Sequence, residues 1–199
     1  YRLSGLEHPL FLEKCIRQEK FVSFRRFPAG PVSPVLDGRI TDYFEWLSAG
    51  EIDLTQFYGG EEGQGESLLS ALFFGYGDGR FYLRLDSRGK FAELLEGGYV
   101  IRLYLCNQKG EFLIAVRGFP EVRAQLYSRG GEGFSELAEL DISCERILEL
   151  AVPTEHMGEG EQELYLVLER EGEVVERYPL SGFFALPPRA EIEKEDWIL

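Results

Sequence analysis

Carboxylates are the most abundant groups in this sequence that could do chemistry. The 199 residues include 35 Asp and Glu against 21 Lys and Arg, which gives a formal net charge of -14. Hydrolytic acid-base chemistry needs two carboxylates held at a fixed separation. With 35 acidic residues any two could be nominated, so their number carries no information about a site. We therefore assign no catalytic residue and predict that the chain is not itself an enzyme.

Histidine and cysteine show no catalytic or metal-binding spacing either. His8 and His156 are the only histidines, and neither lies near a Gly-x-Ser-x-Gly turn of the kind that exposes a nucleophile. The cysteines Cys15, Cys106 and Cys144 are odd in number and far apart, which supports neither a disulfide framework nor a zinc site. We interpret them as free thiols in a reducing compartment, and this predicts a cytoplasmic protein.

Charge and hydropathy exclude several classes of partner. A net charge of -14 repels phosphate backbones and anionic lipid, so neither nucleic acid nor a membrane is expected as a partner. No run approaches the ~20 apolar residues that a membrane-spanning helix needs. The pairs Asp37-Gly38 and Asp78-Gly79 could indicate calcium, but no loop has alternating Asp spacing, and turn formation explains them better. No cofactor is predicted, with calcium as the alternative.

Short alternating segments dominate the chain after residue 66. In residues 80–86, Phe81, Leu83 and Leu85 should face a core while the residues between them face outward. Turn signals recur every 8 to 12 residues and no long helical period separates the strands, which favours an antiparallel sheet over a parallel α/β fold. We predict an all-β antiparallel β-sandwich of jelly-roll or immunoglobulin-like type. The expected strands are 68–76, 80–86, 99–107, 111–117, 122–128, 147–152, 163–170 and 174–178, with 134–140 as a weaker candidate.

Proline, glycine and the distribution of charge indicate how the chain is divided outside the predicted sheet. Residues 6–20 should form a short helix or an irregular arm, and the prolines and glycine of residues 28–34 end this region. We therefore divide the chain into residues 1–30, an arm or linker from an upstream catalytic domain, residues 31–190, the sandwich, and residues 191–199, a tail. Residues 1–30 are locally basic, so the arm could face an acidic neighbour. Residues 59–66 are Gly-rich and polar and predict an exposed loop.

Two stretches carry a family resemblance. Residues 34–50 read PVLDGRITDYFEWLSAG, and residues 73–86 read FFGYGDGRFYLRLD. Together they resemble the accessory domain that follows the catalytic barrel in family 57 glycoside hydrolases, the relatives of amylases, branching enzymes and amylopullulanases. The resemblance covers roughly residues 30 to 190. It implies a DOMON-like or family 9 carbohydrate-binding-module-like fold, a parent enzyme acting on α-glucans, and catalytic carboxylates on the barrel rather than on this chain.

The same motif supplies the candidate carbohydrate-binding residues. Sugar binding needs a flat apolar ring surface for the pyranose C–H face, flanked by hydrogen-bonding groups for the hydroxyls. The aromatic candidates are Tyr43, Trp46 and Tyr58, and the polar candidates are Asp42, Glu45 and Gln56. The alternative is that Phe44 and Trp46 close one end of the sandwich or a seam against a neighbouring domain.

Three hypotheses for the function follow. The first is a non-catalytic accessory domain of a glycoside hydrolase acting on α-glucans, which binds carbohydrate, braces the upstream catalytic domain of the same chain, or does both. The second is a free-standing sandwich hydrolase that acts on glycosides through an unrecognised carboxylate pair. The third is a free-standing sandwich to which sugar is irrelevant.

Overall fold

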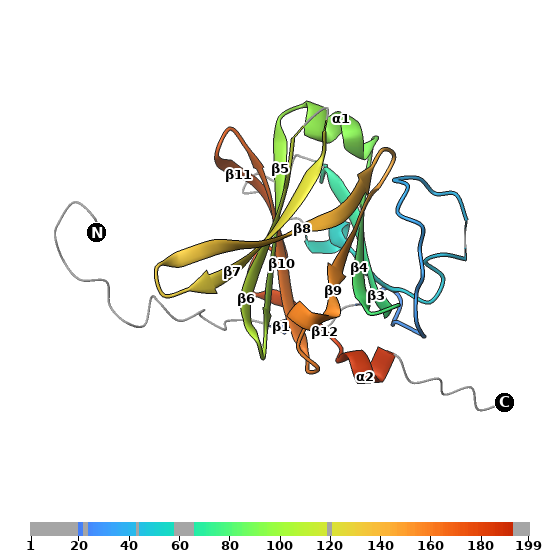
Figure 1. Ribbon diagram of the computed structural model, residues 1–199. Coiled ribbons are helices and arrows are strands. Elements are labelled where there is room, and N and C mark those ends of the chain that lie inside the picture. The colour runs from blue at the N-terminus through green and yellow to red at the C-terminus, as the bar shows by residue number, and fades with distance from the viewer. Residues whose placement is uncertain (1–19, 22–23, 43, 58–65, 119–120, 193–199) are drawn as a thin grey trace.

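The computed structural model describes residues 20–21, 24–42, 44–57, 66–118 and 121–192 (Figure 1). These residues form twelve strands, two short α-helices and two 3-10 helices. The strands are β1 (Lys20–Phe21), β2 (Gly50–Asp53), β3 (Leu69–Gly77), β4 (Arg80–Ser87), β5 (Tyr99–Asn107), β6 (Gly110–Arg117), β7 (Arg123–Gly130), β8 (Gly133–Cys144), β9 (Leu148–Pro153), β10 (Gln162–Arg170), β11 (Glu173–Tyr178) and β12 (Phe183–Leu186), and the helices are α1 (Phe91–Glu96) and α2 (Arg189–Ile192).

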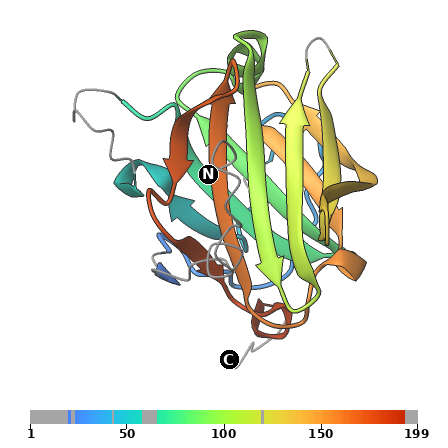
Figure 2. The same ribbon diagram turned by 90° about the vertical axis from the view of Figure 1, so that its left-hand side faces the viewer.

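The strands form one continuous, strongly curled sheet in the order β1-β12-β10-β5-β6-β7-β8-β9-β4-β3-β2, with β11 paired to β10. The long strand β8 connects the two halves: Gly133–Leu140 pairs with β7, and Asp141–Cys144 pairs with β9. All pairings between the described strands are antiparallel except that of β1 with β12. The predicted all-β antiparallel class is therefore confirmed. Because β8 belongs to both halves, the molecule is a curled half-barrel rather than two clearly separate sheets (Figure 2).

One hydrophobic core lies between the two halves of the sheet. Leu83 of β4 stands opposite Phe74 of β3 and Leu150 of β9, and all three are fully buried. In the other half, Leu103 of β5 faces the same core, where it is also fully buried. The period-2 alternation that predicted inward-facing residues on these strands is confirmed.

The two outer edges of the curled sheet meet through side chains. The rings of Phe57, in the 3-10 helix that follows β2, and Phe184 of β12 lie 5.0 Å apart. Glu176 of β11 is buried, and its carboxylate accepts hydrogen bonds from the Leu68 backbone N–H at 2.8 Å and from the Tyr178 hydroxyl at 2.6 Å. Burial and the neighbouring carboxylate raise the pKa of Tyr178, so its hydroxyl stays a donor. Aromatic packing and the buried Glu176 thus hold the two outer edges of the sheet together.

Several elements differ from the sequence-based expectations. Residues 91–96 form the short helix α1, which the pattern did not predict because one turn and a half gives too few periods to detect. The weak candidate at residues 134–140 is part of β8, the longest strand. The predicted arm at residues 6–20 lies almost wholly outside the described residues, and the predicted loop at 59–66 is described only at its last residue. Residues 24–30 are joined to the sheet, since Arg25 and Arg26 hydrogen-bond to the backbone of Glu51.

Candidate functional site

The recognisable motif of residues 34–50 forms a strap over the outer face of the sheet. We use the name strap for residues 32–49, of which all but residue 43 are described. It lies beside β3 and β4 in Figure 1 and packs against Tyr82 of β4 and Ala151 of β9. Tyr82 alternates with the inward-facing residues of β4 and was predicted to face outward. It does so, but the strap buries it, and the side chain is only 6% exposed.

Trp46 is the centre of a second, smaller core between the strap and the sheet. Its side chain is 4% exposed and packs with Val32, Tyr82 and Ala151. The ring of Phe73 lies 6.4 Å away. Removing this apolar surface from water stabilises the attachment of the strap. The indole therefore has no solvent-facing ring on which a sugar could stack.

A fully buried carboxylate fixes the strap from the side of the sheet. Glu149 of β9 accepts hydrogen bonds from the Trp46 indole Nε1 at 2.9 Å, the Gly38 backbone N–H at 2.9 Å and the Asp37 backbone N–H at 3.2 Å. Burial raises the pKa of the Glu149 carboxyl, while the three donors act in the opposite direction. An unpaired buried acid would be costly, so each of these donors is structurally required.

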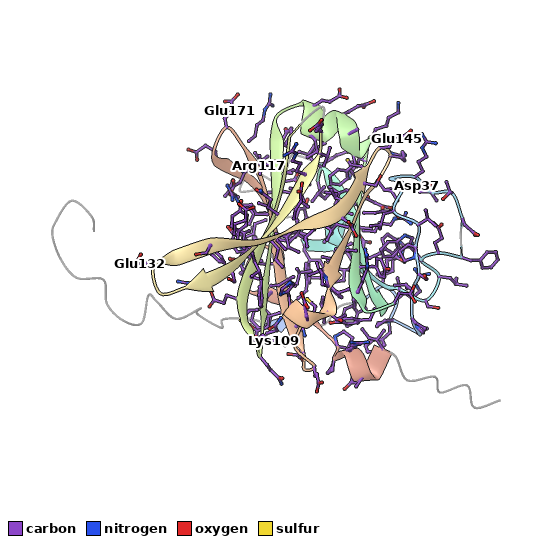
Figure 3. All side chains as sticks on the ribbon, in the orientation of Figure 1. Asp37, Lys109, Arg117, Glu132, Glu145 and Glu171 are labelled. Atoms are coloured by element: carbon purple, nitrogen blue, oxygen red, sulfur yellow. The ribbon has the colours of Figure 1, made fainter. Side chains whose placement is uncertain are left out.

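The Asp37-Gly38 pair of the motif fits against the turn between β8 and β9. Gly38 has a φ of +75°, and its carbonyl accepts hydrogen bonds from the Arg146 and Ile147 backbone N–H groups at 2.8 and 3.0 Å. A Cβ at this position would lie 2.6 Å from the Glu145 nitrogen. Asp37 and Glu145, on the two sides of this contact, are labelled near each other in Figure 3. A glycine is therefore required here both by conformation and by space.

The second recognisable stretch, the β3–β4 hairpin, makes the other contact with the strap. The Val32 backbone N–H donates to the Tyr76 carbonyl at 2.9 Å. A Cβ on Gly77 would lie 1.8 Å from the Val32 carbonyl oxygen, so this glycine permits the close approach of the two backbones. The two recognisable stretches, residues 34–50 and 73–86, are thus in contact, and both contribute to the attachment of the strap to the sheet.

Cationic side chains complete the attachment around Phe73. The Arg84 guanidinium lies 4.6 Å from the Phe73 ring centroid and pairs with both carboxylate oxygens of Asp86, at 2.7 and 2.8 Å. Arg26 lies 6.0 Å from the same ring and donates to the carbonyls of Ala49 and Trp46. Arg84 is 8% exposed, so this cation-π contact is shielded from solvent.

The structure does not bring the predicted carbohydrate-binding residues together as a platform. Tyr43 and Tyr58 lie outside the described residues. Asp42 is exposed, and its carboxylate accepts a local hydrogen bond from the Phe44 backbone N–H at 2.9 Å. Glu45 is half-buried, and the Gln56 amide donates to Asp53. The carbohydrate-binding set as a whole stays a prediction, and the buried position of Trp46 agrees with the packing alternative.

Sequence reasoning missed two features of the strap. One is Glu149, whose signal was a single acid inside the apolar run of residues 147–152. The other is the outer side of the strap, which exposes Ile40, Phe44 and Leu47 at 58%, 72% and 41%. Phe44 and Leu47 belong to one turn, closed by a hydrogen bond of 3.2 Å from the Leu47 N–H to the Phe44 carbonyl. The strap thus buries Trp46 and Ala49 against the sheet and exposes these three apolar residues among polar ones.

In the described part of the chain, no group of three or more His, Cys, Asp or Glu side chains could hold a metal ion. Neither described α-helix has the length and apolar character needed to cross a membrane. In comparisons with known proteins, no family model, no curated protein and no solved structure matches this chain. The resemblance to family 57 accessory domains therefore rests on the motif residues alone.

Proposed function

We propose that this chain is a non-catalytic accessory domain of a family 57-like glycoside hydrolase acting on α-glucans, and that its main role is to brace the catalytic domain. The observation that carries this proposal is the burial of Trp46 and its hydrogen bond to Glu149. The most conspicuous aromatic residue of the motif is used to hold the strap in place. What the strap then offers to a partner is its outer side.

The outer side of the strap has the character of a protein interface. Ile40, Phe44 and Leu47 are exposed apolar residues on a segment whose other side is anchored by Glu149 and Trp46. Protein interfaces favour aromatic and apolar residues at their centre, and a pre-anchored segment loses little conformational entropy on binding. The charged pair of Arg39 and Glu145, beside the turn between β8 and β9, would form part of the polar rim.

The remaining features are compatible with this role. Under the proposal, the curled sheet is a distorted DOMON-like sandwich, in which β8 passes from one sheet to the other as strands do at the corners of such folds. The single core between the two halves supports this interpretation. Cys144 is a free thiol, and a cytoplasmic location is part of the proposal.

Binding of α-glucan is the second candidate role, and the exposure of Phe44 favours it. This ring is 72% exposed and lies beside Asp42 and Glu45, which could bind sugar hydroxyls. Titration of the chain with maltoheptaose tests this role, with a cello-oligosaccharide as the control ligand. Heat that saturates with the α-glucan and is lost in Phe44→Ala would establish it. Absence of heat from both sugars would leave bracing as the only proposed role.

Two experiments test the bracing role: sequencing of the reading frame upstream of this chain, and a binding measurement in solution. The reading frame upstream of Tyr1 should encode a catalytic barrel, and a start codon at that point would contradict the proposal. That barrel, produced separately, should show a higher Tm when this chain is added, because binding to the folded form stabilises it. Ile40→Asp should abolish the shift. Val174→Asp is the matched control. The exposed fraction of Val174 is 59%, close to the 58% of Ile40, but Val174 lies on β11, away from the strap.

A further inference from the structure

The first part of β8, Gly133–Leu140, lies at an edge of the sheet. It pairs with β7, whereas β9 pairs with the following residues, Asp141–Cys144. Every strand has two edges that can form hydrogen bonds, because successive residues direct their N–H and C=O groups to opposite sides. Among the described strands, none pairs with the second edge of Gly133–Leu140. We use the name β8 edge for this second edge.

The β8 edge belongs to a hairpin that projects from the body of the sheet, with Glu132 at its tip (Figure 3). Residues 131–137 are all exposed, so the described residues cover neither face of this part of the hairpin. Phe134 and Leu137 are exposed to 39% and 45%. A two-stranded hairpin is at best marginally stable in water, so a third strand would stabilise this one.

The β8 edge lacks most of the features that protect natural edge strands from pairing. Such edges are usually short or carry lysine or proline. The sequence of residues 133–140 is GFSELAEL, which contains neither lysine nor proline. A bulge opposite Leu126 and Tyr127 interrupts the pairing with β7. The charged residues of the edge are both acids, Glu136 and Glu139.

These two acids give the β8 edge an excess of negative charge. Neither Glu136 nor Glu139 forms an ion pair with another described residue. The Glu136 carboxylate accepts a hydrogen bond of 3.3 Å from the Gln125 amide. The arginines of the adjacent β7 are paired elsewhere, with Glu111 at 2.6 Å and with Glu121 at 2.9 Å.

The β8 edge leads into an acidic cleft where β8 and β9 diverge. The cleft encloses about 250 Å³, and its charged lining residues are Asp78, Arg80, Glu139 and Asp141. Arg80 forms an ion pair with Asp141. Three carboxylates therefore surround one guanidinium, and the cleft suits a further cationic side chain. Since Glu139 belongs both to the edge and to the cleft, a strand on the edge would bring its side chains to this cleft.

The charge of the β8 edge distinguishes two kinds of added strand. A second copy of this chain has a net charge of -14 and would bring its own Glu136 and Glu139 to the edge. Like charges on neighbouring strands are destabilising. A strand that alternates basic with apolar residues would instead pair its cations with these acids, and its apolar residues would cover Phe134 and Leu137.

We propose that the β8 edge receives a strand from a basic partner, namely an extended segment in which lysine or arginine alternates with apolar residues. The backbone of this segment pairs with the N–H and C=O groups that Gly133–Leu140 directs away from β7. One of its cations enters the cleft beside Glu139. The proposal uses none of the exposed apolar residues of the strap, so it does not depend on the bracing role.

Amide hydrogen exchange of the whole chain, measured by NMR, tests this strand addition. The probe is a synthetic peptide of about eight residues in which lysine alternates with valine, and the control peptide has glutamate in place of lysine. At saturating lysine peptide, exchange should slow about tenfold or more at the amides of residues 133–140 that point away from β7. The amides bonded to β7 should change little, and the glutamate peptide should have no effect.

Charge reversal on the β8 edge should invert the choice of peptide. Glu136→Lys combined with Glu139→Lys should lose protection by the lysine peptide and gain protection by the glutamate peptide. Glu96→Lys is the matched control, since Glu96 is also an exposed acid but lies at the end of α1. This control should respond to both peptides as the wild type does.

Four results would overturn the proposal. The first is unchanged exchange at the β8 edge with the lysine peptide. The second is equal protection by both peptides, or an equal loss of protection in Glu96→Lys, which would mean that the edge acids do not select the strand. The third is binding heat without slower exchange, which would mean ionic adsorption. The fourth is protection that rises with protein concentration without peptide, which would assign the edge to a second copy of the chain.

Discussion

The indole nitrogen of Trp46 donates a 2.9 Å hydrogen bond to the carboxylate of Glu149, a residue 103 positions later in the chain. The same carboxylate accepts hydrogen bonds from the backbone N–H groups of Asp37 and Gly38, earlier in the strap. One buried acid therefore ties two separate parts of the strap to the sheet. Four of the predictions below follow from this attachment or from the burial that accompanies it.

Replacing the acid should loosen the strap. Glu149→Gln keeps the size of the side chain, but its amide N–H₂ cannot accept from the backbone donors of Asp37 and Gly38. We expect a loss of about 1–3 kcal/mol in the free energy of unfolding, the usual cost of an unsatisfied buried polar group. Urea denaturation of this variant beside Glu159→Gln, an exposed acid, measures the difference. Equal midpoints for both variants would mean that Glu149 does not hold the strap.

The stability difference between the wild type and Glu149→Gln should also depend on pH. Burial raises the pKa of Glu149 in the folded protein above its unfolded value, and the hydrogen bonds from Gly38, Trp46 and Asp37 only partly offset this. A raised folded pKa gives a stabilising contribution that is present below the unfolded pKa and is lost as the pH rises through the folded pKa. The stability of the wild type relative to Glu149→Gln should therefore fall as the pH rises above ~4, the region of the unfolded pKa. A relative stability that instead rises with pH would show that the three donors outweigh burial.

We expect Trp46→Ala to lower the free energy of unfolding. Deleting a buried aromatic side chain costs about 3–5 kcal/mol, and less where the surrounding segment can collapse. Unfolding in urea followed by circular dichroism measures this cost. If the variant were as stable as the wild type, Trp46 would be a surface residue, and the carbohydrate platform predicted from the sequence would regain support.

The glycine of the hairpin that touches the strap should not tolerate a methyl group. Gly77→Ala would place a Cβ 1.8 Å from the Val32 carbonyl oxygen, so one backbone must move. We expect a loss of about 1–3 kcal/mol or more, as for other overpacked sites. Gly89→Ala is the matched control, since a Cβ there meets nothing within 4 Å. A similar small effect at both positions would contradict the close contact between strap and hairpin.

The Cys144 thiol should be unreactive in the folded protein. Burial raises its pKa to about 12, so very little thiolate is present at neutral pH. In a Cys15→Ser, Cys106→Ser background, we expect alkylation to be about 100-fold slower or more in buffer than in concentrated urea, where the thiol regains a pKa near 8.5. Comparable rates in the two solvents would place the thiol in contact with water.

The sequence predicted the local features of the fold better than the long-range ones. Alternation along Phe81, Leu83 and Leu85 identified a strand and its buried face, because that pattern depends only on neighbouring residues. It could not show that the outward residue Tyr82 would also be buried, since this requires the strap. Nor could it show that β8 would pair with β7 and then with β9, which turns the expected two sheets into one curled sheet.

The candidate site shows the same limit. The local sequence around Trp46 is an aromatic residue among polar ones. This pattern is expected both for an exposed sugar-binding platform and for a buried anchor. Only the position of Glu149, on a strand more than a hundred residues away, distinguishes the two. The exposure of Phe44 could not be predicted for the same reason, because it depends on which side of the strap is held against the sheet.

The most direct test of the bracing role is the affinity between this chain and the catalytic domain encoded upstream of it, measured by calorimetric titration. The account predicts saturable binding that Ile40→Asp abolishes, because a carboxylate would be buried at the centre of the interface, and that Val174→Asp leaves unchanged. Absence of binding by the folded wild-type chain, or equal weakening by both variants, would contradict the claim that the strap braces a catalytic domain.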